Sequence, residues 1–413
     1  MKEEIVVNKV SIKEKRIEIL FDVTVGLKPY FNSTQRVFWL DYSEDISKVP
    51  VSLAVVPFVC NVLPILWLTD AKLSIQELDK TFFDSIPIFE QGYINMYPML
   101  EFKGSVEPQK IVDNHYGTDG GNAAFFSGGV DAFTTLVCHR SEIPLLITLR
   151  GSDIKLDDIE GWDNVYKHLQ ETVNLFKLPI PICVTSNFRT FINEGTLSKL
   201  VVNSNDGWWH GFQCGIGLIA QAAPIAYLKH IKVVYIASSY TLNDKIPSAS
   251  YPTIDNYVRF GETQVVHDQY EHHRQEKMQI LIKYHKETTN KLNLRVCWIS
   301  RGGKNCCHCE KCLRTIFALM AEGESPRDYG FYYTEEDILN SKNVVVESLY
   351  NTNDGVRADW IHVKERFNET GAYKDDPRIN WVYTLDPYAK KPSPPKPSLL
   401  TRIVRKIRRT LKS

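Results

Sequence analysis

The sequence has no run of 18 or more apolar residues, and this absence excludes a typical transmembrane helix. Its start contains several acidic residues and no apolar core, so we expect no secretory leader there. The 49 basic and 49 acidic residues give a net charge of zero, without the basic excess of a general nucleic-acid binder. We therefore expect a cytoplasmic protein with no nucleic acid among its partners.

The zero net charge conceals an uneven distribution. Nine Lys/Arg and no Asp/Glu follow residue 389, which leaves 40 basic and 49 acidic residues and a net charge of −9 in the rest. Residues 398–413 carry their apolar side chains at helical spacing, between Arg and Lys. This tail is either an amphipathic helix at the inner face of an anionic membrane or a solvated basic segment.

A length of 413 residues suits two or three domains. Residues 1–110 predict a mixed α+β domain, with strands at 5–10, 16–23 and 36–40, a helix near 74–84, and core residues over 49–68. From residue 122, short apolar segments alternate with helical stretches, which indicates an α/β fold with a parallel sheet and helices on both faces. The expected strands are 123–126, 145–149, 180–185, 233–237 and 294–299, with helices at 163–176 and 211–229.

The segment NAAFFSGGVDAFTTLVCHR, residues 122–140, joins an expected strand to an expected helix through two glycines. The glycines permit positive φ angles and leave room for a ligand, while the start of the helix offers free N–H groups and a partial positive charge. This pattern predicts phosphate binding by Ser127, Gly128, Gly129, Val130 and Asp131, with Ser127 and Asp131 catalytic and Asp131 holding Mg²⁺. The alternative is a tight turn with no ligand.

The motif SGGVDA resembles the SGGxDS/T loop of the PP-loop ATP pyrophosphatases, also called adenine-nucleotide alpha hydrolases. The resemblance implies a HUP-type, Rossmann-like domain over residues 120–320 that cleaves ATP between the α and β phosphates. Such enzymes adenylate a substrate oxygen, and a nucleophile then displaces AMP. Ala132 stands where the family has its last Ser/Thr, so Thr134 or Thr135 would have to supply that hydroxyl.

Five of the nine cysteines lie between residues 297 and 312, which indicates a metal site. Cys297, Cys306, Cys309 and Cys312 offer four thiolates, enough to close a tetrahedral Zn²⁺ site that holds structure and leaves no position for water. Free or redox-active thiols and an iron–sulfur cluster are the alternatives. Cys307 and His308 lie inside this zinc knuckle and are not expected to be ligands, although His308 could replace one of the cysteines.

The glycine turn followed by this cysteine spacing, with Arg314 two residues after the last cysteine, resembles the 7-cyano-7-deazaguanine synthase family. The resemblance covers about residues 120–320. It implies adenylation of a carboxylate or amide oxygen followed by C–N bond formation, in modified-nucleoside or surface-polysaccharide biosynthesis. The substrate would be a small molecule, a sugar or a protein carboxylate, and an oligomer is compatible with the sequence. The competing interpretation is a non-catalytic ATP-binding or scaffold protein with a degenerate loop.

Other polar residues follow the expected strands. Asp153 and Asn187 are predicted to contact the nucleotide, although Asp153 could equally cap a helix. His210 could approach a nucleotide or pack in the core, and residues 237–240 could face the same cleft. Arg274 and Lys277 could bind an anion or form a solvated helix face. Residues 321–388 predict a helical extension, and 389–413 a Pro-rich spacer with the basic tail.

Overall fold

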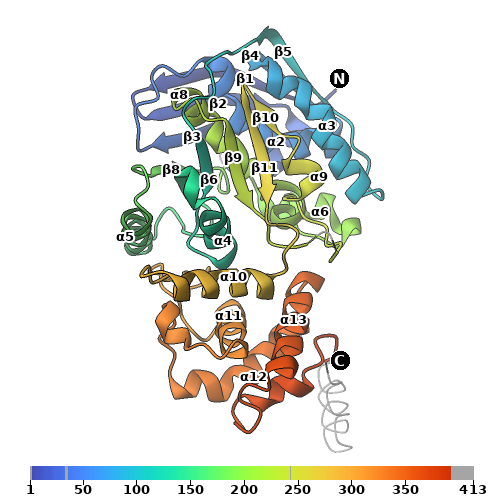
Figure 1. Ribbon diagram of the computed structural model, residues 1–413. Coiled ribbons are helices and arrows are strands. Elements are labelled where there is room, and N and C mark those ends of the chain that lie inside the picture. Colours follow the sequence, from blue (N-terminus) through green and yellow to red (C-terminus); the bar gives the residue numbers. More distant parts are fainter. Residues whose placement is uncertain (1, 33–35, 242, 392–413) are drawn as a thin grey trace, which may run out of the picture.

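A computed structural model describes residues 2–32, 36–241 and 243–391, and an eleven-stranded, mostly parallel sheet runs through them (Figure 1). The predicted spacer from Pro392 and the basic tail lie outside the described residues. The strand order is β10-β11-β9-β6-β7-β8-β3-β2-β1-β4-β5. The α/β class predicted from the sequence is confirmed.

Five parallel neighbours form the half of the sheet that follows residue 121: β6 (Asn122–Phe125), β7 (Leu145–Arg150), β8 (Ile182–Ser186), β9 (Val233–Ala237) and β11 (Thr263–Asp268). The strands expected near the first four are confirmed. The strand expected at 294–299 is wrong, and β11 takes its place in the sheet. The backbone of that segment forms hydrogen bonds with loops in place of a neighbouring strand. Leu294 N–H donates to Tyr329 O, and Arg295 N–H donates to Gly128 O.

The first 112 residues continue the same sheet. Its strands are β1 (Glu4–Lys13), β2 (Arg16–Val23), β3 (Val37–Tyr42), β4 (Lys72–Asp79) and β5 (Ser105–Val112). β3 pairs antiparallel with β8 and thereby joins the two halves. The helix expected at 74–84 is shifted, because β4 extends to Asp79 and α3 (Lys80–Met96) begins after it.

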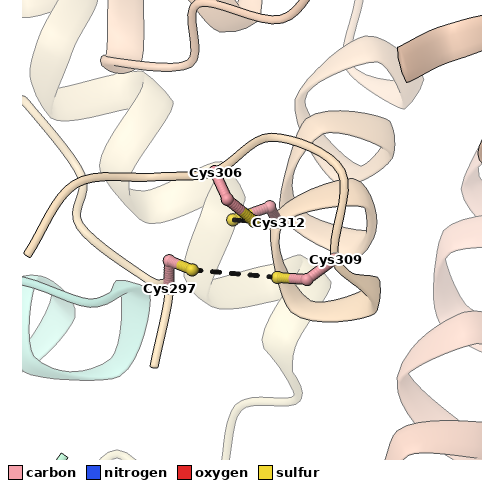
Figure 2. Close-up of side chains that lie close together, drawn as sticks. All are labelled: Cys297, Cys306, Cys309 and Cys312. Atoms are coloured by element: carbon pink, nitrogen blue, oxygen red, sulfur yellow. Dashed lines mark hydrogen bonds between the residues drawn. The ribbon is translucent and has the colours of Figure 1, made fainter. Parts of the chain in front are cut away.

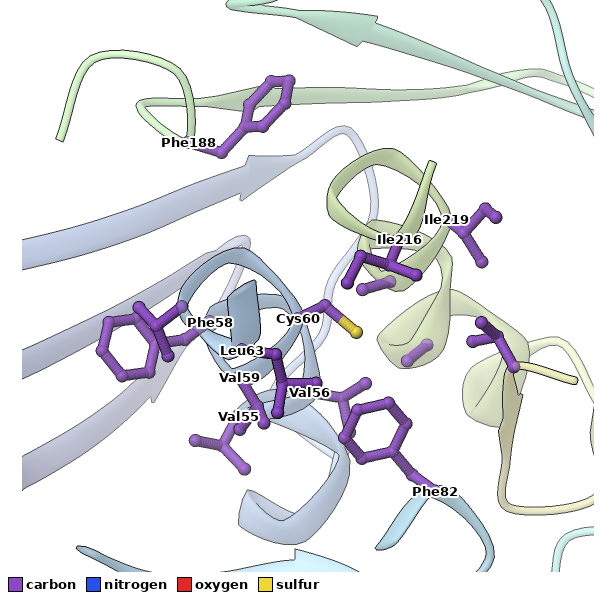
Figure 3. Close-up of a cluster of buried hydrophobic side chains, with 14 of the residues drawn as sticks. Val55, Val56, Phe58, Val59, Cys60, Leu63, Phe82, Phe188, Ile216 and Ile219 are labelled. Carbon is purple, nitrogen blue, oxygen red and sulfur yellow. The ribbon is translucent and has the colours of Figure 1, made fainter. Parts of the chain in front are cut away.

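Both faces of the parallel strands are buried. Ala123 and Phe125 of β6 belong to one hydrophobic core, and Ala124 and Phe126 belong to another on the opposite face. The first core contains α1 (Val51–Ala54) and α2 (Val56–Thr69), which confirms the core predicted over 49–68. Figure 3 shows side chains of α2 among Phe188, Ile216 and Ile219.

The remaining helices of the α/β part are α4 (Val130–Cys138), α5 (Ile159–Phe176), α6 (Glu194–Leu200), α7 (Ile216–Ile219), α8 (Ala223–Leu228) and α9 (Pro252–Asp255), and β10 is the short strand Arg259–Phe260. The helix expected at 211–229 is broken into a π-helical turn (Trp209–Gln213), α7, a 3₁₀ turn (Ala220–Ala222) and α8.

Four helices of the C-terminal part gather at one end of the sheet: α10 (Arg274–Glu287), α11 (Glu310–Ala321), α12 (Glu335–Leu349) and α13 (Asp354–Thr370). In Figure 1, α10 lies beyond the arrowheads of β9 and β11, between the sheet and the other three helices. It packs against α4 and α13. Among the described residues, no helix is long and apolar enough to cross a membrane.

A histidine links the end of α4 to β11. The two imidazole nitrogens of His139 lie 2.7 Å from Glu142 Oε1 and 3.0 Å from Asp268 Oδ1, and the ring stacks on Tyr235. The hydrogen bond to Asp268 outweighs burial and, with the bond to Glu142, raises the pKa of His139 to about 9.

This raised pKa predicts a loss of stability in mild alkali. The contribution of protonated His139 is fully present below the unfolded pKa of about 6.5 and disappears as the pH rises through 9. We expect the wild type to lose roughly 1–2 kcal/mol more than His139→Gln between pH 6.5 and 9.5, after allowance for solvent screening. Urea unfolding across this range measures the difference, and the exposed His115→Gln is the control. Parallel pH profiles for wild type and His139→Gln would contradict the assignment.

Candidate functional site

The glycine turn lies where β6 ends and α4 begins. Gly128 has a φ of +80°, and a Cβ there would lie 2.7 Å from His168 Cε1, so the position requires glycine. Gly129 caps α4, and its N–H donates to Ser127 Oγ at 3.4 Å. The first helical bond runs from Phe133 N–H to Gly129 O, so the N–H groups of residues 130–132 lie outside the helical ladder. This strand–turn–helix arrangement matches the sequence expectation.

Arg295 binds the carbonyl groups of the glycine turn. Its Nε and Nη2 donate to Ser127 O at 3.2 and 3.0 Å, and its backbone N–H donates to Gly128 O at 2.7 Å. Arg295 therefore engages the carbonyl groups of Ser127 and Gly128, and these bonds use none of the N–H groups at the start of α4. Arg295 was not among the residues predicted from the sequence, although its place two residues before Cys297 connects the turn to the cysteine cluster.

Replacing Gly128 with alanine tests this geometry. We expect destabilisation by about 2 kcal/mol, since the positive φ alone costs roughly 1–2 kcal/mol and the methyl group also meets His168. Gly121→Ala is a matched control, because Gly121 has a φ of +84° with no atom within 4 Å of the added Cβ. Urea unfolding measures both variants. An equal cost in the two variants would contradict the close approach of His168.

Asp131 is an ion-pair partner of two buried cations. Its Oδ2 lies 3.0 Å from Arg274 Nη1, and its Oδ1 lies 3.6 Å from Lys277 Nζ. Burial raises the pKa of Asp131, but Arg274, Lys277 and more distant cations outweigh this effect and lower it. The side chains of Arg274 and Lys277 are 7% and 0% exposed, so the solvated helix face considered for them is wrong.

The cations around Asp131 have unused hydrogen-bonding capacity. Nε and Nη2 of Arg274 are buried, and no partner for them is present in the described part of the chain. The ammonium group of half-buried Lys311, at the start of α11, likewise has no hydrogen bond or ion pair among these residues, and burial lowers its pKa. Buried donors such as those of Arg274 normally have partners. A bound anion would supply them.

The sheet topology places this cluster beyond the carboxyl ends of the strands, at a reversal of strand order that we call the crevice. The chain runs from β6 to β7 and β8 on one side, then returns to β9 and β11 on the other, so the order reverses between neighbours β6 and β9. In open α/β sheets, ligands bind beyond the carboxyl ends of strands at such a reversal. Lys277 Nζ donates to Ser238 O at 2.6 Å and so connects the loop after β9 to Asp131.

The other two predicted nucleotide residues differ in their surroundings. Asp153 is exposed after β7, and its charge acts on Lys311 and Arg295. It is not a helix cap, because Asp158 caps α5. Asn187 is bonded to β3, since its Oδ1 accepts from Trp39 N–H and its Nδ2 donates to Val37 O, both at 2.9 Å. A nucleotide contact by Asn187 would have to replace these bonds.

Neither threonine of α4 supplies the hydroxyl that is missing at Ala132. Thr134 Oγ1 is buried and donates to Val130 O at 2.9 Å within the helix. Thr135 is also fully buried, and its side chain lies next to Asp268. The turn therefore offers backbone N–H groups and Ser127 as its polar contacts.

The four predicted cysteine ligands converge. Cys297, Cys306, Cys309 and Cys312 place their sulfur atoms within 4.8 Å of one another, and two of these pairs are separated by 3.9 Å (Figure 2). A tetrahedral ion with metal–sulfur bonds of about 2.3 Å requires sulfur atoms about 3.8 Å apart. Hydrogen bonds from the other three thiols lower the pKa of Cys297, which favours the thiolate that binds metals. The cluster can therefore hold a metal such as zinc.

Comparisons with family models, with curated proteins and with solved structures find no match to this chain.

The residues inside and after the knuckle have other partners. Cys307 Sγ donates to Asn305 O, and His308 is exposed, 3.9 Å from Asp337. Arg314 is buried between Glu310 and Asp359 and links α11 to α13. The knuckle thus lies between two segments that reach the crevice, since Arg295 precedes Cys297 and Lys311 precedes Cys312. Of these residues, Lys311 and Asp359 had no signal in the sequence beyond their charge.

Proposed function

We propose that this protein is an ATP-dependent enzyme of the PP-loop type. It cleaves ATP to AMP and pyrophosphate, adenylates a carboxylate or amide oxygen of its substrate, and then forms a C–N bond. The observation that carries the proposal is the buried guanidinium of Arg274, whose two unpartnered nitrogens lie beside a glycine turn at the sheet's crevice. A phosphate group would satisfy these donors.

In this proposal, the chain binds ATP mainly through charge and backbone donors. The N–H groups at the start of α4 would receive phosphate oxygens, and Arg274, Lys277 and Lys311 would neutralise negative charge that moves onto pyrophosphate. These groups are already fixed by packing, so little reorganisation accompanies the reaction. Asp153 is exposed at the same edge and is available to contact the nucleotide.

Asp131 does not fit the predicted role of Mg²⁺ ligand in this arrangement. A ligand needs carboxylate oxygens that are free to approach the ion, whereas both oxygens of Asp131 face buried cations. We therefore infer that Asp131 holds Arg274 and Lys277 in position. Mg²⁺ would enter with ATP, and no step is assigned to it.

The proposed metal of the cysteine cluster is zinc, in a structural role. Four cysteine thiolates complete the tetrahedral coordination that Zn²⁺ prefers, which leaves no position for water or substrate. When bound, zinc would fix the segment before Cys297 relative to the start of α11. Arg295 and Lys311 would thereby be held at the two sides of the crevice.

A second candidate is a non-catalytic ATP-binding or scaffold protein. Ala132 favours it, because Thr134 and Thr135 are buried and give the turn no replacement hydroxyl. Such a protein would bind ATP without turnover. Substituting Ala132→Ser would then restore a hydroxyl next to the phosphates.

Nucleotide product analysis separates the two candidates. The purified protein is incubated with ATP, Mg²⁺, ammonium and a small-molecule extract of its host, and AMP, ADP and pyrophosphate are quantified. We expect AMP and pyrophosphate from the wild type and roughly 100-fold less from Lys311→Met, because each charged donor to the transition state contributes on that order. The exposed Lys304→Met is the control. ATP binding without AMP would favour the second candidate, and ADP as the product would contradict the first.

A further inference from the structure

Asp206 and His210 form an ordered acid–imidazole pair. His210 Nδ1 lies 2.9 and 3.0 Å from the two carboxylate oxygens of Asp206. The same carboxylate accepts from Tyr97 OH at 2.8 Å and from Gly207 N–H at 2.7 Å. An ionised carboxylate can only accept hydrogen bonds, so His210 opposite Asp206 carries its proton on Nδ1. In the neutral imidazole, Nε2 is then the basic nitrogen.

The backbone around His210 leaves room for Asp206 to contact its imidazole. His210 lies in the π-helical turn Trp209–Gln213, a rare conformation that is frequent at functional sites. Gly211 follows, and a Cβ at this residue would lie 2.8 Å from both Asp206 Oδ2 and Tyr97 OH. The glycine is therefore required for Asp206 to approach the turn.

The basic nitrogen of His210 lies next to the loop that follows β9. Nε2 lies 3.3 Å from the hydroxyl of Tyr240, which is in the loop after β9. This loop follows β9, the neighbour of β6 at the reversal of strand order, and its Ser238 carbonyl accepts a hydrogen bond from Lys277, which pairs with Asp131. The contact with Tyr240 is long for an O–H···N bond, so a substrate group can replace it. The His210 side chain is 29% exposed.

We propose that His210 is a catalytic residue of this crevice, the general base that deprotonates the attacking nitrogen. This role rests on the proposed function. The nitrogen lone pair forms the new C–N bond at the adenylated carbon, and the C–O bond to AMP breaks with its electron pair leaving on the phosphate oxygen. The proton lost by the nitrogen passes to His210 Nε2. Asp206 holds the resulting imidazolium, as a positioning residue.

A structural role for His210 makes different predictions. Tyr240 also contacts the C-terminal helices, because Asn353 Nδ2 lies 3.4 Å from its hydroxyl and Gly355 of α13 packs against its ring. In that case, the contact between His210 and Tyr240 would only tie α13 to the sheet. Loss of His210 would then lower stability and slow both halves of the reaction equally.

Rapid-quench kinetics distinguish the two roles in the full-length protein with ATP, Mg²⁺, ammonium and host extract. Pyrophosphate reports adenylation, and AMP reports attack by nitrogen. For His210→Gln, we expect the first pyrophosphate release to stay within about twofold of wild type, while AMP release falls at least about 100-fold. The AMP rate of the variant should also lose a pH-dependent step that the wild type shows. The exposed His115→Gln is the control.

Each contrary result has a definite meaning. Equal loss of pyrophosphate and AMP, or AMP release within twofold of wild type, would overturn the catalytic role and leave the proposed enzyme intact. Absence of pyrophosphate release by the wild type would overturn the proposed function, and this role with it. ¹⁵N spectra of histidine-labelled protein supply a test without substrate: we expect the Nδ1–H tautomer for His210, and the Nε2–H tautomer would overturn the proposal.

Discussion

Replacing Cys309 with serine should remove the metal and destabilise the protein strongly. A ligand that binds only the folded state stabilises it by about 4 kcal/mol when present at 1,000 times its dissociation constant. The serine hydroxyl is a poor replacement for a thiolate, so most of this contribution should be lost. Metal content by mass spectrometry and the midpoint of thermal unfolding measure the two effects. A chelator should move the wild type toward the variant.

Cys307→Ser is the matched control. Cys307 is as buried as the ligands Cys297 and Cys312, but its sulfur bonds to Asn305 O instead of joining the cluster. We expect this variant to keep its metal and to show only the modest cost of a polar atom in a buried position. Metal retained at full occupancy by Cys309→Ser would refute the four-cysteine ligand set. Iron in place of zinc would leave the ligands correct and change the proposed metal.

The elements predicted well from the sequence are those with local signals. β6, β7, β8 and β9 are short and almost wholly apolar, as expected of strands buried on both faces. β11 was missed because Gln264, His267 and Asp268 give its sequence, TQVVHD, a polar character. Tertiary contacts accommodate these polar side chains. For example, Nδ1 of His267 pairs with the buried carboxylate of Asp255 at 2.8 Å. Such a pair leaves no pattern in the local sequence.

The candidate site was predictable only in part, for the same reason. The glycine turn and the cysteine spacing are continuous in the sequence, and both converge as expected. The cation cluster, in contrast, combines Asp131 of α4 with residues of α10 and α11 that lie more than 140 positions away. Whether Arg274 is buried depends on how α10 packs against α4 and α13, which the pattern of apolar residues in α10 alone does not determine.

Asn187 and Asp131 differ from their predicted roles in the same way. Both residues follow a strand at the ligand edge, and both were predicted to face a nucleotide or its ion. In the structure, Asn187 completes the junction between β3 and β8, and Asp131 orients two cations. A polar residue at this edge can thus serve the protein's own packing. The first 112 residues supply the partners of Asn187 through β3, so the added strands change what the edge can bind.

Substituting Asp131→Asn should both destabilise the protein and change its response to ATP. Removing one partner of a buried ion pair costs roughly 3–5 kcal/mol, since Arg274 and Lys277 keep their charges without compensation. ATP phosphates would supply negative charge to the same cations. We therefore expect the variant to unfold at a lower temperature than the wild type and to gain more from saturating ATP. Pyrophosphate release should be lost, because the cations are no longer held in position.

Leu339→Asn, at an exposed position on α12, provides the control for a change that does not touch the cluster. Thermal unfolding with and without ATP gives the result directly. A variant that keeps wild-type stability would show that the pairs with Arg274 and Lys277 contribute little. A variant that is destabilised but gains no more than the wild type from ATP would place the phosphates away from Arg274. If ATP binding instead required Asp131 and Mg²⁺ together, the variant's response to ATP would disappear, and Asp131 would return to the metal-binding role.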